Sequence, residues 1–141
     1  HGALYNTIVH HEAHAKAVID GIKAFSPELA VMLLPGGVAV DIAERAGLRV
    51  IREAFADRGY NPDGTLVSRR EPGAVLRDPE DVAKRVLQVA ATGSVAAIDG
   101  SEVEVQAESV CVHGDSPGSV EMTRRVARTL HDEGIRIEAV L

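Results

Sequence analysis

A short buried strand that leads directly into a helix is predicted by SVCVHGDSPG, residues 109–118. Cys111, His113 and Asp115 alternate along this stretch, so in an extended chain their side chains share one face. Ser116-Pro117 suits an N-cap followed by a first helical residue. Polar side chains where a strand becomes a helix are typical of functional sites in α/β proteins, although a hydrogen-bonded turn without a catalytic role explains the same residues.

Alternating helices and strands are predicted on both sides of this stretch. Helices are expected from residue 6 or 7 to 25, over 38–46, over 79–91 behind an Asp78 cap, and after Pro117 as far as Gly134. Strands are expected at 29–34 (covered on both faces), 49–56, 65–68 (short and exposed), 95–98 with 102–106 (a hairpin or two short strands), and 135–141. This succession predicts a single α/β domain over residues 1–141 with largely parallel strands.

The composition excludes several functional classes. The chain has 141 residues, of which 45% are hydrophobic and 3% aromatic, so the core consists of aliphatic side chains. The net charge of -6 and the lack of a basic run argue against nucleic acid and anionic membranes as partners. No apolar run reaches the length of a membrane span. The single cysteine, Cys111, allows no internal disulfide, which fits the reducing cytoplasm.

The strand at 49–56 carries acidic side chains on a face that otherwise looks apolar. Glu53, Phe55 and Asp57 share that face, and Arg58 follows directly. A buried carboxylate is costly unless it is paired or used, so these residues predict either a functional site or a buried Glu–Arg pair. The sequence favours the site, because both acids lie at the carboxyl end of a strand.

Two other polar segments are weaker candidates. His10 and His14 are one helical turn apart, but they lie off the apolar stripe of their helix and are expected to be solvated. The polar excursion at 61–73 is long enough to be a lid, a binding loop or a contact surface. Arg69 and Arg70 in it could bind phosphate or carboxylate, but solvent exposure is the default expectation.

Four separated stretches together resemble one family, LamB/YcsF. They are HGALYN at the start, EAFADRGY with PDGTLV, EPGAV, and CVHGDSPG. The resemblance implies an irregular (β/α) barrel related to the barrels of polysaccharide deacetylases. Family members are longer, so this chain resembles the latter part of one and is expected to form a partial barrel with open strand edges.

The activity implied by the resemblance is the ATP-dependent opening of 5-oxo-L-proline, a small lactam, to L-glutamate. The family does this with 5-oxoprolinase subunits B and C as partners, and the resemblance implies ATP as the cofactor. A five-membered lactam is a stabilised amide, so coupling to ATP is chemically reasonable. A metal-dependent hydrolase of C–N bonds and a non-catalytic assembly fragment are the alternatives.

The resemblance also implies which side chains form the site. The expected catalytic residues are Asp115, His113 and Glu53, and the expected substrate-binding residues are His1, Asn6, Asp57, Arg58 and Tyr60. Asp115 or Glu53 is expected to act as general base, and Arg58 to hold a carboxylate or phosphoryl group. Whether a divalent metal binds is open, with His1 and His113 as candidate ligands. Cys111 is expected to be a small apolar filler rather than a nucleophile.

Overall fold

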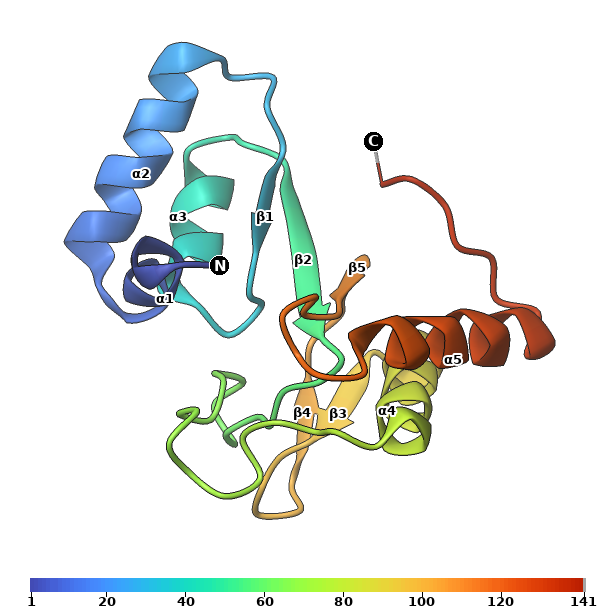
Figure 1. The fold of residues 1–141 in the computed structure, drawn as a ribbon. Coiled ribbons are helices and arrows are strands. Elements are labelled where there is room, and N and C mark those ends of the chain that lie inside the picture. The colour runs from blue at the N-terminus through green and yellow to red at the C-terminus, as the bar shows by residue number, and fades with distance from the viewer. Residues whose placement is uncertain (141) are drawn as a thin grey trace.

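The computed structural model describes residues 1–140, which form five helices and five strands, with two groups of helices beside a small parallel sheet (Figure 1). The helices are α1 (Ala3–His10), α2 (Glu12–Phe25), α3 (Val38–Arg45), α4 (Pro79–Thr92) and α5 (Ser119–Asp132). The strands are β1 (Val31–Leu33), β2 (Val50–Phe55), β3 (Ser94–Ala96), β4 (Glu102–Glu104) and β5 (Ser109–Cys111). The sheet order is β1-β2-β5 with both pairings parallel, which confirms the predicted α/β class.

The first half of the chain packs its three helices beside β1 and β2 (Figure 1). Helix α3 connects the two strands and forms a βαβ unit, in which Val31 pairs with Val50. The core between these elements is aliphatic, as the composition predicts. It contains Ile8, Ala15, Ile19, Val31, Leu33, Ala39, Val40, Ala43, Leu48 and Val50.

The second half places α4 against α5 and adds the antiparallel β3–β4 hairpin. Asp78 caps α4 as predicted, because its carboxylate accepts hydrogen bonds from the backbone N–H groups of Glu80 and Asp81. Strand β5 then returns to pair with β2, so that Phe55 lies beside Cys111. This return brings the second half of the chain to the carboxyl end of β2, where the candidate site lies.

The predicted helix at 6–25 is wrong in its start and its continuity. Two helices are present, α1 begins at Ala3, and His11 interrupts them with an extended backbone. The His11 ring accepts a hydrogen bond from the backbone N–H of His14, so His11 is the N-cap of α2. Phe25, the last residue of α2, is 84% exposed.

Several predicted strands also differ from the structure. Strand β1 is shorter than 29–34, and its Met32 is 41% exposed, so the strand is covered on one face only. Residues 65–68 form a single bridge, Leu66 to Tyr60, and Val67 is buried rather than exposed. The final segment is irregular from 135 to 140, where a strand was expected, and Leu141 lies outside the described residues.

Residues 109–118 begin with a strand as predicted, but the helix after it starts later than expected. Strand β5 is only partly buried, and α5 begins at Ser119 behind Gly118, whose φ of 81° is in the left-handed region. Ser116-Pro117 therefore belongs to the turn and not to the helix. Within residues 1–140, no helix combines the length and the apolar character needed to cross a bilayer.

Candidate functional site

A cleft of about 240 Å³ opens at the carboxyl ends of β2 and β5. Such ends are the usual location of sites in α/β proteins, because the connecting segments diverge there and leave a crevice. The first residue of the chain closes one side of the cleft, and the segment that follows β2 closes another. The cleft is lined by His1, Tyr5, Asn6, Phe55, Arg58, Leu66, Val67, Ser68, Arg69 and His113.

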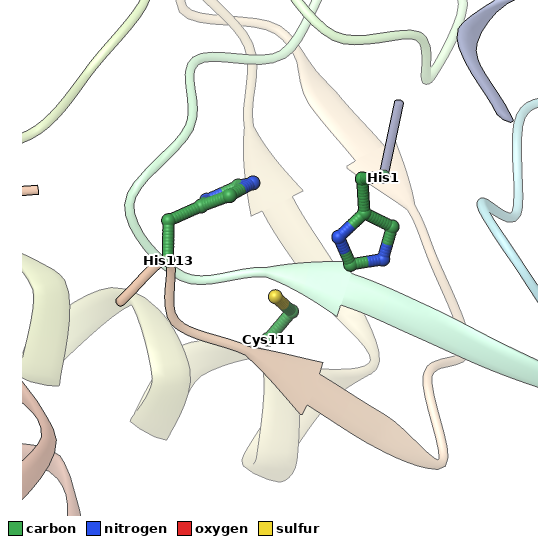
Figure 2. A group of neighbouring side chains, drawn as sticks. All are labelled: His1, Cys111 and His113. Atoms are coloured by element: carbon green, nitrogen blue, oxygen red, sulfur yellow. The ribbon is translucent and has the colours of Figure 1, made fainter. Parts of the chain in front are cut away.

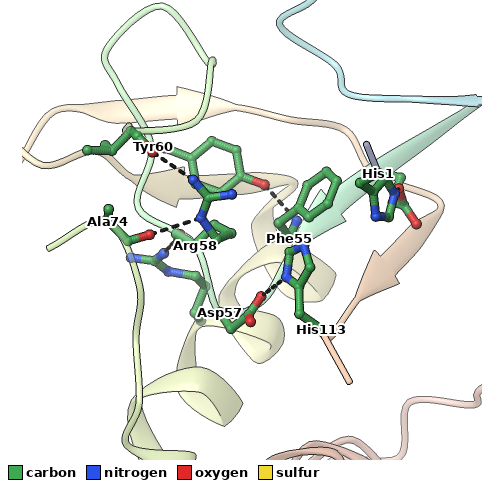
Figure 3. Close-up of polar contacts among 10 residues, drawn as sticks. His1, Phe55, Asp57, Arg58, Tyr60, Ala74 and His113 are labelled. Atoms are coloured by element: carbon green, nitrogen blue, oxygen red, sulfur yellow. Dashed lines mark hydrogen bonds and ion pairs between the residues drawn. The ribbon is translucent and has the colours of Figure 1, made fainter. Parts of the chain in front are cut away.

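His113 is held by Asp57 on the buried side of this cleft. His113 Nδ1 lies 2.8 Å from Asp57 Oδ1, and the carboxylate is fully buried (Figure 3). The His113 ring also stacks on Phe55, with ring centroids 5.5 Å apart. Because Nδ1 is occupied, the free ring nitrogen is Nε2. A carboxylate that fixes the orientation of a histidine in this way is typical of acid–base and metal sites.

His1 forms a second pair of the same kind with Glu53. Its Nε2 lies 2.7 Å from Glu53 Oε2, and Glu53 is 5% exposed. The ring contacts Tyr5 and Phe55 edge to face, with centroids 4.6 Å and 4.8 Å away. The predicted cost of burying Glu53 is therefore met by a histidine and not by Arg58. Two carboxylate-held imidazoles consequently lie edge to face, with ring centroids 5.8 Å apart.

Burial raises the pKa of Glu53, and the positive potential of His113 opposes that shift. The folded state therefore binds the Glu53 proton more tightly than the unfolded chain does. The contribution of Glu53 to stability is largest below its ordinary pKa and is lost as the pH rises through the folded-state pKa.

We therefore expect Glu53→Gln to become more favourable relative to the unchanged protein as the pH rises from about 4 to about 8. Melting temperatures of both proteins across this range test the expectation. Exposed Glu104→Gln is the matched control, because Glu104 lies on the solvent side of β4 and its substitution removes no burial cost. A melting temperature of the unchanged protein that rises with pH relative to Glu53→Gln would contradict it.

Cys111 completes a group of potential metal ligands with the two histidines. One ligand atom each of His1, Cys111 and His113 lie within 4.8 Å of one another, and Figure 2 shows the thiol below and between the two rings. Burial, with added repulsion from Glu53 and Asp57, raises the pKa of Cys111 to about 11. The free thiol is therefore protonated at neutral pH, which supports the expectation that Cys111 is no nucleophile.

Arg58 and Tyr60, both expected to bind substrate, make hydrogen bonds to the backbone, and Arg58 also lines the cleft. Arg58 donates from Nε to the Ala74 carbonyl (3.0 Å) and from Nη2 to the Val67 carbonyl (2.7 Å), and it is buried. Burial, and the nearby charge of Arg69, lower its pKa. The Tyr60 hydroxyl accepts a hydrogen bond from the backbone N–H of Phe55 and does not line the cleft. Burial raises its pKa to about 12.

The remaining predicted residues lie in three places: on the cleft wall, buried behind it, and on the surface. Asn6 lines the cleft, and its side chain donates to the Gly2 carbonyl. Asp115 is exposed in the turn before α5 and does not line the cleft, whereas His113 does. Glu53 and Asp57 lie behind the histidines rather than on the cleft wall. His10 and His14 are solvent-exposed, as expected.

Tyr5, Phe55 and Arg69 line the cleft but were not predicted as site residues from the sequence. Phe55 could have been predicted as a site residue, because it alternates with Glu53 and Asp57 and so shares their face. Arg69 is exposed, as expected, but its position is on the cleft wall. Tyr5 could not be predicted beyond its place in the first motif, because its contact with Phe55 depends on how α1 packs against α2 and α3.

Comparisons with known proteins agree in one assignment. The LamB/YcsF family model matches residues 1–141. The A subunit of 5-oxoprolinase from Corynebacterium jeikeium is 67% identical over 141 residues, which are 100% of this chain and 55% of that protein. The corresponding 5-oxoprolinase A subunit from Kocuria rhizophila is 56% identical over 139 residues, covering 99% of this chain and 55% of that protein.

A solved structure is also similar to the whole described fold. The lactam utilization protein from Thermus thermophilus superposes with a TM-score of 0.90 and 40% sequence identity, covering 99% of this chain and 55% of that one. The fold is thus an α/β partial barrel, as predicted. The chain spans about 55% of the length of the relatives it matches.

Proposed function

The chain belongs to the LamB/YcsF family, and we propose on this basis that it forms part of an enzyme that opens 5-oxo-L-proline to L-glutamate with consumption of ATP. The relatives bear the name of a 5-oxoprolinase subunit, and the similar solved structure is a lactam utilization protein. The single observation that carries the proposal is the cleft with two neighbouring, carboxylate-held imidazoles, His1 and His113.

The reaction requires a proton to be removed from water and another to be given to the ring nitrogen of the lactam. In this proposal ATP would transfer its terminal phosphoryl group to the lactam oxygen and leave as ADP, which makes the carbonyl carbon electrophilic. Once water has added and the C–N bond has broken, the group would leave as inorganic phosphate. His113 is the general acid–base in this proposal, because Asp57 occupies Nδ1 and leaves Nε2 free. Asp57 and Glu53 act as positioning residues, since each holds a histidine and neither lines the cleft.

The carboxylate of the substrate needs a cationic partner in the cleft. Arg69 fits this role better than Arg58, because Arg69 is an exposed lining residue and Arg58 gives two donors to backbone carbonyls. The planar guanidinium group binds a carboxylate through two parallel hydrogen bonds. The small volume of the cleft suits a five-membered ring.

ATP and the partner subunits belong to the complete assembly in this proposal. Residues 1–141 contain no glycine-rich phosphate loop, so nucleotide binding is assigned to the assembly rather than to a motif of this chain. The relatives are named as one subunit of 5-oxoprolinase, which indicates a multi-subunit enzyme. We assign subunits B and C of 5-oxoprolinase as the partners of this chain and the cytoplasm as its compartment.

Glutamate release from 5-oxo-L-proline, measured in the complete protein with subunits B and C, tests the proposal. We expect glutamate and ADP in equal amounts, and no glutamate without ATP. Arg69→Ala is expected to raise KM for 5-oxo-L-proline by about tenfold or more, since an ion-supported hydrogen bond to a charged group contributes roughly 1.5–3 kcal/mol.

Two controls make this experiment specific. Arg70→Ala removes a neighbouring exposed arginine that does not line the cleft, and it should leave KM unchanged. The lactam 2-pyrrolidinone has the same ring without the carboxylate, so its rate of opening should be the same in Arg69→Ala as in the unchanged protein. If the complete assembly releases no glutamate, or releases it equally well without ATP, the proposed reaction is wrong.

A further inference from the structure

Three soft or borderline donor atoms from distant parts of the chain converge beside the cleft. We infer that His1, Cys111 and His113 form a binding site for a borderline-soft divalent cation of the Zn²⁺ class. Their ligand atoms lie within 4.8 Å of one another. Zinc–ligand bonds of about 2.0–2.3 Å place the ligand atoms of a tetrahedral site about 3.3–3.6 Å apart. The three side chains would therefore have to move by about 1 Å to bind one ion.

The hydrogen bonds of the two histidines leave suitable nitrogens for such an ion. Glu53 occupies Nε2 of His1 and Asp57 occupies Nδ1 of His113, so the free atoms are His1 Nδ1 and His113 Nε2. The Cys111 thiol lies between the two rings (Figure 2). Metal-binding histidines nearly always have the other ring nitrogen bonded to a carboxylate or carbonyl. Both histidines meet this condition.

The charges around the group also favour a bound cation. Glu53 and Asp57 are both buried, and Asp57 Oδ2 has no hydrogen-bond partner among the described residues. Buried carboxylates require compensation by positive charge or hydrogen bonds. A divalent ion on the three ligands would supply positive charge to both carboxylates through the imidazole rings.

The donor set indicates the class of ion and its coordination. Two imidazoles and a thiolate suit zinc and similar ions, whereas Mg²⁺ and Ca²⁺ prefer oxygen ligands. Three protein ligands leave a fourth position, and both histidines line the cleft, so that position faces it. The exposed His11–His14 pair also offers ring nitrogens, but neither ring is held by a buried carboxylate.

Metal binding to the complete, chelator-treated protein tests this inference without reference to any activity. We expect one equivalent of Zn²⁺ at this site, lost in Cys111→Ala and in His113→Ala. Co²⁺ in its place should give a thiolate-to-cobalt charge-transfer band that is absent in Cys111→Ser. Asp57→Asn should weaken binding about 10- to 100-fold, the usual effect of changing a carboxylate behind a ligating histidine.

The double variant His11→Ala with His14→Ala is the control and should retain the full equivalent. Zn²⁺ should also protect Cys111 from iodoacetamide in the unchanged protein, a readout that does not depend on any variant folding. The inference is overturned if Zn²⁺ gives no protection, if the cobalt band persists in Cys111→Ser, or if the control loses the equivalent. A bound ion would occupy His113 Nε2, the atom to which the proposed reaction assigns proton transfer, so Zn²⁺ at this site should inhibit glutamate release. Binding is measured separately from glutamate release, so failure to bind leaves the proposed reaction standing.

Discussion

Substitution of His113 by alanine is expected to lower kcat for glutamate release by at least about 100-fold, the usual contribution of a general acid–base. His113 is the group best placed to move protons, because it lines the cleft and Asp57 holds its ring in one orientation. KM for 5-oxo-L-proline should change little, since the ring does not carry the substrate charge. The measurement is steady-state glutamate release by the complete assembly.

Companion variants separate chemistry from structure. Asp57→Asn keeps the shape of the side chain but changes the hydrogen bond to His113, so kcat should fall while KM stays within about threefold. Exogenous imidazole should restore part of the activity of His113→Ala, which a merely structural role would not allow. His14→Ala removes an exposed histidine of α2 and should be silent. Activity of His113→Ala within about threefold of normal would exclude this role for His113.

Gly59→Ala is expected to be the most destabilising glycine substitution near the site, with a loss of about 1–3 kcal/mol or more from overpacking. A Cβ at Gly59 would lie 2.5 Å from the Gly73 carbonyl oxygen. The backbone at Gly59 has little freedom to move away, because Gly59 N–H donates to the Ala74 carbonyl and the Gly59 carbonyl accepts from Val67 N–H. The measurement is the free energy of unfolding from a denaturant titration.

Gly21→Ala is the matched control for this prediction. Gly21 lies inside α2, and no atom lies within 4 Å of where its Cβ would be. Alanine there should stabilise the protein by roughly 0.5–1 kcal/mol, because it reduces the backbone freedom of the unfolded chain. Equal stabilities of the two variants would show that the approach of residues 59 and 73 is looser than the structure indicates.

The sequence was most informative where one local pattern determines one structure. The cap at Asp78, the end of α3 before Gly47 and the β3–β4 hairpin follow from side-chain chemistry within a few residues. Glu53 and Phe55 alternate along β2 as expected, and Asp57 and His113, each two residues beyond the end of its strand, pair with one another. The cap, the helix end and the hairpin need no knowledge of distant partners.

The pairings inside the site could not be derived in the same way. A functional site was favoured for Glu53, with a buried pair to Arg58 as the alternative, and its partner in the structure is His1, 52 residues away. Arg58 donates hydrogen bonds to backbone carbonyls of the irregular segment that follows β2, and the path of that segment cannot be predicted from local residue preferences. Asp115 shares the alternation of His113 in an extended chain, but the strand ends at Cys111, so the alternation does not extend to it. Tertiary packing determined each of these outcomes.

The parallel pairing of β2 with β5 also has a kinetic consequence. Helices α1 to α3 and the β1–β2 pair form from segments close in sequence, whereas the contact between Asp57 and His113 spans 56 residues. Closing so long a loop lowers the chain entropy before any contact between its ends stabilises the fold, so such pairings form late and slowly. We expect the first half of the chain, α1 to α3 with β1 and β2, to form early, and the side of the cleft that contains His113 to form last. A folding intermediate would therefore be compact yet unable to act on any ligand, and appearance of the cleft would mark the end of folding.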